Sequence, residues 1–79
     1  MKYYLTKVIT EEVDIDFNDL YSKASETLST DNVDYIYTDI MDNLAYYIDI
    51  VYGVEAEDED ALSIIEEDFG AWMKTEKGL

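Results

Sequence analysis

The chain has 79 residues, and its 20 Asp and Glu against 5 Lys and Arg give a net charge of −15. It contains no Cys and no His, which excludes disulfides, zinc–thiolate sites and the usual general base. Nucleic acids and anionic membranes attract Lys and Arg, so this charge excludes direct binding to either. We therefore expect a single acidic domain over residues 1–79, without metal or cofactor, that binds a basic partner.

The N-terminal residues favour a strand. Hydrophobic residues make up 48% of the chain and aromatic residues 14%, which is enough for a folded core. Residues 3–9 are rich in aromatic and β-branched types, which predicts a strand. Its partner is either a second strand around Val13 and Ile15, after a turn at residues 10–12, or the sheet edge of another molecule.

The rest of the chain predicts about three amphipathic helices. The first covers residues 17–28 with Asp16 as its N-cap, and the second covers residues 32–52 and stops at Gly53. The third follows the acidic stretch 55–60, and Gly70 within it indicates either close packing or an early helix end. The predicted fold class is α+β, mainly helical: a short N-terminal strand or hairpin followed by about three amphipathic helices.

Negative charge is segregated along the chain. Between Ala24 and Met73 there are 14 Asp or Glu residues and no Lys or Arg, whereas ordinary surfaces mix the two signs. This pattern indicates that the negative field itself serves binding, although a merely solvated face is the alternative. The predicted partner-binding residues are Asp31, Asp34, Tyr35, Asp39, Asp42, Tyr46, Asp49, Glu55, Glu57, Asp58, Glu59, Asp60, Glu66 and Glu67.

A row of carboxylates on a helix can imitate the phosphates of a nucleic acid. On one straight helix, Asp31 and Asp42 lie about 16 Å apart at about 1.5 Å per residue. A groove that receives phosphates would attract such a row electrostatically. Tyr35, Tyr46 and Tyr52 would add contact area, or else lie at the rim of the core.

Other kinds of site are disfavoured by their spacing. Asp14, Asp16 and Asn18 begin a calcium-loop pattern, but Asp19 stands where that loop needs glycine. An acyl carrier protein attaches its prosthetic group to a serine that follows aspartate, and no serine of this chain does so. We expect no enzymatic activity, no spanning helix and a cytoplasmic location.

At the level of class, the chain resembles the small acidic DNA-mimic inhibitors of phages and mobile elements, which act against CRISPR or restriction systems. The segment 42–48, Asp-Asn-Leu-Ala-Tyr-Tyr-Ile, is similar to a helical stretch of ArdA-type antirestriction proteins. The resemblance implies an inhibitor whose partner is a CRISPR effector, a restriction enzyme or a nuclease in the host bacterial cytoplasm. A homodimer that builds the acidic surface jointly stays open.

Two alternatives stand beside this interpretation. Colicin-type immunity proteins are also small, acidic and helical, and they block a basic nuclease. An interaction module would instead bind through apolar surface, with the N-terminal strand or Trp72 as its contact and the acids serving solubility. Binding that is lost at high salt favours the mimic, and binding that persists favours the apolar module.

Overall fold

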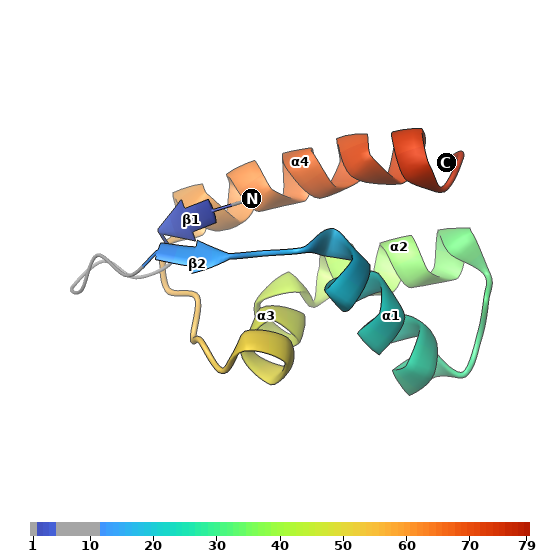
Figure 1. Ribbon diagram of the computed structural model, residues 1–79, viewed down its shortest axis with the longest axis horizontal. Helices are drawn as coiled ribbons and strands as arrows, with labels where there is room; N and C mark the ends of the chain where they lie inside the picture. The colour runs from blue at the N-terminus through green and yellow to red at the C-terminus, as the bar shows by residue number, and fades with distance from the viewer. Residues whose placement is uncertain (1, 5–11) are drawn as a thin grey trace.

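The computed structural model describes residues 2–4 and 12–79, which form a short hairpin and a mainly helical body (Figure 1). The mainly helical prediction is confirmed. The elements are β1 (Lys2–Tyr4), β2 (Glu12–Asp14), α1 (Phe17–Leu28), α2 (Val33–Asp42), α3 (Leu44–Tyr52) and α4 (Glu59–Glu76).

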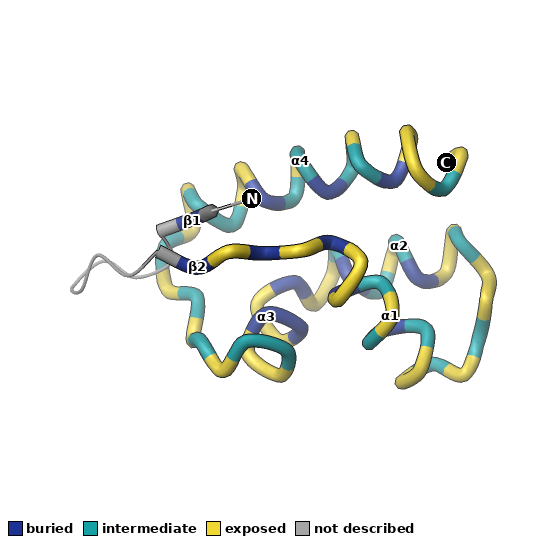
Figure 2. The backbone as a smooth tube through the Cα atoms, in the orientation of Figure 1, coloured by how far each residue is buried: buried dark blue, intermediate teal, exposed yellow. Residues whose placement is uncertain are grey.

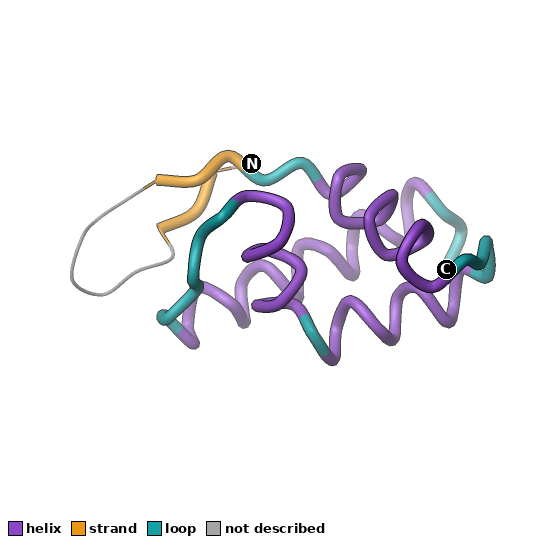
Figure 3. Tube along the Cα trace, turned by 90° about the horizontal axis from the view of Figure 1, so that it is seen from below, coloured by secondary structure: helices purple, strands orange, loops and turns teal. Residues whose placement is uncertain are grey.

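The two strands pair antiparallel, with Tyr3 opposite Val13, and lie at one end of the helical body (Figure 3). Both side chains of this pair are buried. The Tyr3 hydroxyl donates a hydrogen bond of 2.8 Å to Asp68 Oδ2, which ties the hairpin to α4. Residues 5–9 of the predicted strand and residues 10 and 11 of the predicted turn lie outside the described residues.

The first helix has the predicted bounds because its start and its inner face are both encoded locally. Asp16 is extended, and its Oδ1 accepts from the backbone N–H of Asn18 at 2.9 Å, as an N-cap does. Phe17, Leu20 and Ala24 then recur at helical spacing and are buried.

The prediction of one continuous helix over residues 32–52 is wrong, because the chain breaks at Asn43 into α2 and α3, whereas the predicted stop at Gly53 is confirmed. Asn43 has φ −131° and ψ 34°, outside the helical region. Its side-chain Nδ2 donates to the carbonyl of Asp39 at 3.1 Å, so the side chain competes for a backbone acceptor as asparagine commonly does. We call this break the elbow.

The last helix continues through Gly70, so the predicted early end is not found. A Cβ on Gly70 would lie 3.6 Å from the Tyr37 hydroxyl, an ordinary contact distance, so the position has room for a side-chain carbon and the other prediction, close packing, is not found either. Ile65, Phe69 and Met73 recur at every fourth position and are buried. Figure 2 shows buried positions repeating along α4, and Figure 1 shows α4 lying across the hairpin and the other helices.

Candidate interaction surface

Five of the predicted partner-binding residues gather around the elbow. A shallow hollow of about 410 Å³ is lined by Asn32, Asp34, Tyr35, Thr38, Asp39 and Asp42. Tyr46, on the first turn of α3, joins them through Tyr47: its ring lies 5.6 Å from the Tyr47 ring, and the Tyr47 hydroxyl donates to Asp39. We define the elbow surface as Asp34, Tyr35, Asp39, Asp42 and Tyr46.

Helix periodicity and a cap set the positions of the α2 residues. Positions 34, 38 and 42 form one row, because side chains four apart lie above one another. Asn32 caps the helix by accepting at Oδ1 from the backbone N–H of Tyr35 at 3.0 Å. Asp34 in the first turn is also favoured by the helix dipole.

The elbow surface is open and aromatic as well as acidic. The side chain of Tyr35 is 57% exposed and that of Tyr46 is 56% exposed. Asp34 and Asp42 are exposed, whereas Asp39 is half-buried. An approaching protein would therefore meet two tyrosine rings and at least two carboxylates.

Asp39 also holds the elbow together. Its Oδ2 accepts from the Tyr47 hydroxyl, and Asn43 Nδ2 lies 3.4 Å from its Oδ1. The first contact connects α2 to α3, and the second lies at the break itself. Replacing Asp39 would therefore disturb the shape of the surface as well as its charge.

The other residues predicted to bind the partner lie outside the elbow surface. Asp58 caps α4, since its Oδ1 accepts from the backbone N–H groups of Asp60 and Ala61 at 3.0 and 3.3 Å. Glu66 and Glu67 line a separate hollow together with Tyr37 and Met41 of α2, which do not line the elbow hollow. The remaining predicted residues are exposed and do not line the elbow hollow: Asp31, Asp49, Glu55, Glu57, Glu59 and Asp60.

Sequence reasoning missed the positioning roles of two tyrosines. The hydroxyl of Tyr47 joins the two halves of the elbow, a role that the helical spacing of apolar residues does not indicate. Tyr52 was predicted either to add contact area or to lie at the rim of the core, and the structure packs it, partly buried, against the core. Its hydroxyl accepts from the backbone N–H of Asp16 at 2.8 Å and lies 3.2 Å from Asp19 Oδ2, so it connects the end of α3 to the start of α1.

Three tyrosines should make the fold sensitive to alkaline pH. Burial, with the hydrogen bond and charge of Asp39, raises the pKa of Tyr47, and burial with Asp68 raises that of Tyr3. Burial also raises the pKa of Tyr52. The unfolded chain then loses these protons first, at about pH 10, so the free energy of unfolding should fall as pH rises above that value.

Denaturant unfolding from about pH 9 to about pH 12 measures this loss. Tyr47→Phe should lower stability at neutral pH by about 1 kcal/mol and make the alkaline fall shallower, because one ionising group is gone. Tyr46→Phe is the control, because the Tyr46 ring is exposed. A flat free energy of unfolding across this range would contradict the prediction.

No protein family, curated protein or solved structure matches the chain. A proposal about its function therefore has to be argued from the sequence and from the geometry described above. In residues 2–4 and 12–79, no group of three or more Asp and Glu side chains is arranged to hold a metal ion. None of the helices in the described residues combines the length and the apolar character needed to cross a membrane.

Proposed function

We propose that the protein is a non-enzymatic inhibitor that imitates nucleic-acid phosphates and blocks the DNA- or RNA-binding groove of a host-defence nuclease. The observation that carries the proposal is the elbow surface, where exposed tyrosine rings stand beside carboxylates. This combination resembles the two features of a nucleic acid that a binding groove contacts, the charged backbone and the flat bases.

The spacing of the carboxylates supports the comparison with a phosphate backbone. Asp34 and Asp42 lie on one row of α2, about 12 Å apart at about 1.5 Å per residue. A groove lined with Lys and Arg, built to neutralise phosphates, would attract these charges from a distance. Tyr35 and Tyr46 would then add large, rigid contact area at low entropy cost.

The absence of Lys and Arg from the two helices of the elbow supports a role for the negative field. The sequence from Ala24 to Met73 holds 14 acidic residues and no Lys or Arg. The elbow surface therefore has no basic residue on its own helices to neutralise it. A face needed only for solubility would normally mix both signs and gain stability from helix ion pairs.

The partner in this proposal is a basic nucleic-acid-binding protein or complex: a CRISPR effector, a restriction enzyme or another nuclease. The protein would act in the host bacterial cytoplasm, where such targets work, and would need no cofactor. It would not bind nucleic acid or membranes directly. A homodimer would double the acidic surface and is a further form in which the inhibitor could act.

The runner-up is an immunity- or antitoxin-like module that binds through apolar surface. The observation that favours it is the exposure of Ile64 on α4, at 54%, and of Ile50 on α3, at 38%. Trp72 is a weaker contact for such a partner than the sequence indicated, because its ring packs on Phe17 and Phe69.

Capture from nuclease-treated bacterial lysate separates the two functions. The tagged protein is incubated at about 0.1 M salt and at about 1 M salt, where the screening length falls from about 10 Å to about 3 Å. Recovery of a nucleic-acid enzyme at low salt, and its release by added DNA or RNA, is the result expected. A partner that stays bound at high salt and ignores nucleic acid would overturn the proposal in favour of the apolar module.

A further inference from the structure

The outer face of α4 is a stripe of exposed residues on the side opposite the core. Ile65, Phe69 and Met73 are buried on the inner side. At about 100° per residue, the opposite side is formed by positions 60, 64, 67, 71 and 74, and all of these are exposed. Figure 1 shows no described element above α4, and Figure 2 shows exposed positions recurring along that side. We define the α4 outer face as Asp60, Ile64, Glu67, Ala71 and Lys74.

The two ends of the α4 outer face carry opposite charges. No acidic residue lies three or four positions from Lys74, and no basic residue lies within four positions of Asp60, so neither can form an ion pair along the helix. In residues 2–4 and 12–79, neither side chain takes part in an ion pair. Lys77 differs, because its Nζ lies 4.4 Å from the centroid of the Tyr21 ring. The acid at one end and the lysine at the other are therefore available to a second molecule.

The order of the charges on this face is complementary to its own reverse. Asp60 lies seven positions before Glu67, and Lys74 lies seven positions after it. When two copies of α4 pack antiparallel about a two-fold axis at Glu67, Lys74 of each copy meets Asp60 of the other, and the same contact forms twice. Glu67 is close to the middle of α4, so the two helices overlap along nearly their whole length of about 27 Å. Antiparallel packing also sets opposite ends of the helix dipoles side by side.

The sizes of the side chains fit the same register. Ile64 is 54% exposed, and it lies about as far before Glu67 as Ala71 lies after it. The large side chain of one copy therefore packs against the small one of the other, as the close approach of packed helices requires. The alternative register pairs Glu67 with Lys74. It would set Ile64 opposite Lys77, whose ammonium group already lies over two aromatic rings, and so would not bury it.

We infer that the α4 outer face binds a second copy of this chain, antiparallel and with the two-fold axis at Glu67. A uniformly basic partner would be repelled by Lys74, and a uniformly acidic one by Asp60 and Glu67, whereas a second copy matches both signs. A single helix face buries less than the roughly 800 Å² per partner of a standard interface, and the net charge of −15 opposes association. We therefore expect a weak dimer, with a dissociation constant of about 0.1 mM.

The inference is independent of the proposed function. The α4 outer face shares no residue with the elbow surface, so the dimer carries two elbow surfaces and forms whether or not they bind a nuclease. The variant Asp34→Lys with Asp42→Lys, which tests the elbow surface, should dimerise at least as well as the unaltered protein, because it lowers the net negative charge. Loss of the dimer in that variant would contradict an interface on α4.

Sedimentation equilibrium at about 0.15 M salt, where charges more than about 8 Å apart are largely screened, measures the dimer. The unaltered protein should show a reversible monomer–dimer equilibrium between about 0.01 and about 1 mM, and a protein that is still monomeric at about 1 mM would overturn the inference. Asp60→Lys and Lys74→Asp each set like charges opposite one another twice. Each variant alone should therefore dimerise at least about tenfold more weakly.

Mixing these two single variants distinguishes the register from the total charge. In a mixed dimer, the lysine introduced at position 60 faces the aspartate introduced at position 74, and the unaltered Lys74 faces the unaltered Asp60. The mixed pair also carries the same total charge as two unaltered copies. An equimolar mixture should therefore dimerise at concentrations where each variant alone is a monomer, and circular dichroism verifies that both are folded. A mixture that dimerises no better than the separate variants would contradict the pairing.

The residue at the axis should have the opposite effect. Glu67 faces its own copy across the two-fold axis, so the two carboxylates repel each other. Glu67→Gln removes this repulsion and should strengthen the dimer at least about threefold. Glu26→Gln, at an exposed position on α1, removes the same charge away from the interface and should strengthen the dimer less than about twofold. If the two variants have equal effects, or if Glu67→Gln weakens the dimer, the axis does not lie at Glu67 and the inference fails.

Discussion

Reversing the two exposed carboxylates of the elbow surface, Asp34→Lys with Asp42→Lys, should weaken binding to the captured nucleic-acid enzyme at least about 100-fold. Like charges brought together across an interface cost several kcal/mol, and each 1.4 kcal/mol is about tenfold in affinity. Asp39 is left in place because its carboxylate holds the Tyr47 hydroxyl across the elbow. Titration at low salt measures the loss, and circular dichroism verifies that the variant is folded.

The matched control changes the net charge by the same amount at other exposed sites. Glu26 lies on α1 and Glu67 on α4, and each lines a hollow other than the elbow. Glu26→Lys with Glu67→Lys should weaken binding by less than about tenfold, through the loss of long-range attraction alone. If the two double variants lose affinity equally, total charge governs the association and the elbow surface is not the contact.

Local signals were sufficient for the first helix and for the acidic face of α2. Asp16 as a cap and the apolar spacing that begins at Phe17 act within a few residues of each other, so no other part of the chain is needed to predict α1. The acids of α2 fall on one side for the same reason. Burying Ile36 and Ile40 leaves Asp34 and Asp42 exposed.

The elbow could not be predicted from periodicity, because the apolar spacing continues from Ile40 through Leu44 without interruption. A single asparagine costs a helix interior only a fraction of a kcal/mol. The break depends also on a contact between residues eight apart, the hydrogen bond from Tyr47 to Asp39. An asparagine within an apolar helical pattern was the one signal present, and it is weak by itself.

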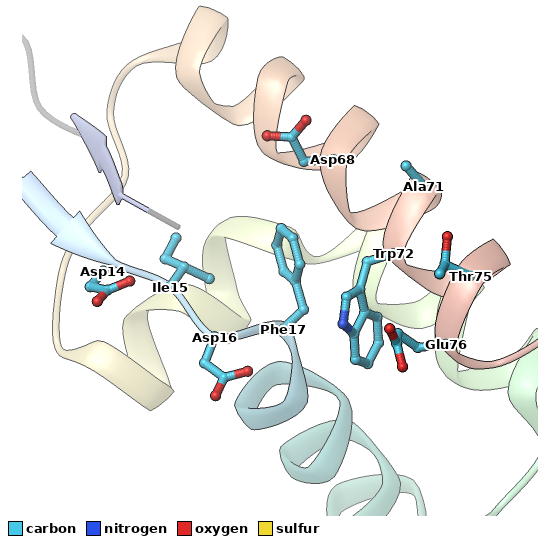
Figure 4. Close-up of a pocket in the computed structure, with 9 residues that line it drawn as sticks. All are labelled: Asp14, Ile15, Asp16, Phe17, Asp68, Ala71, Trp72, Thr75 and Glu76. Atoms are coloured by element: carbon cyan, nitrogen blue, oxygen red, sulfur yellow. The ribbon is translucent and has the colours of Figure 1, made fainter.

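Which acids share a surface depends on how the helices pack against one another. The spacing of residues along the chain does not reveal this packing. Glu66 and Glu67 were grouped with the α2 acids by charge alone, but they line a hollow with Tyr37 and Met41 that is separate from the elbow hollow. The hollow between α4 and residues 14–17 could not be predicted for the same reason, since residues 14–17 and 68–76 meet only in the folded chain (Figure 4).

The Phe69 ring of α4 packs against aromatic rings of two other helices, so its removal should lower the free energy of unfolding more than any other change proposed here. Phe69 is fully buried. Its ring meets Phe17 of α1 edge-on at 5.4 Å and stacks on Tyr37 of α2 at 6.0 Å. Phe69→Ala removes these contacts and leaves a cavity, which costs about 3–5 kcal/mol.

A loss of this size brings the domain close to unfolding. At about 0.05–0.15 kcal/mol per residue, a chain of 79 residues has a total stability of about 4–12 kcal/mol, and a net charge of −15 works against it through self-repulsion. Phe69→Ala should therefore be largely unfolded at about 0.01 M salt. It should regain helix at about 1 M salt, where the charges are screened.

Thermal melts followed by circular dichroism at both salt concentrations measure this effect. The unaltered protein should also melt at a higher temperature in the higher salt, because the repulsion acts on its folded state too. Ile64→Ala on the same helix is the control. That side chain is 54% exposed, so its loss should change stability by less than about 0.5 kcal/mol. Melting temperatures that do not respond to salt would mean that the acids repel one another too weakly to oppose folding, and the negative field on which the proposed function relies would then be correspondingly weak.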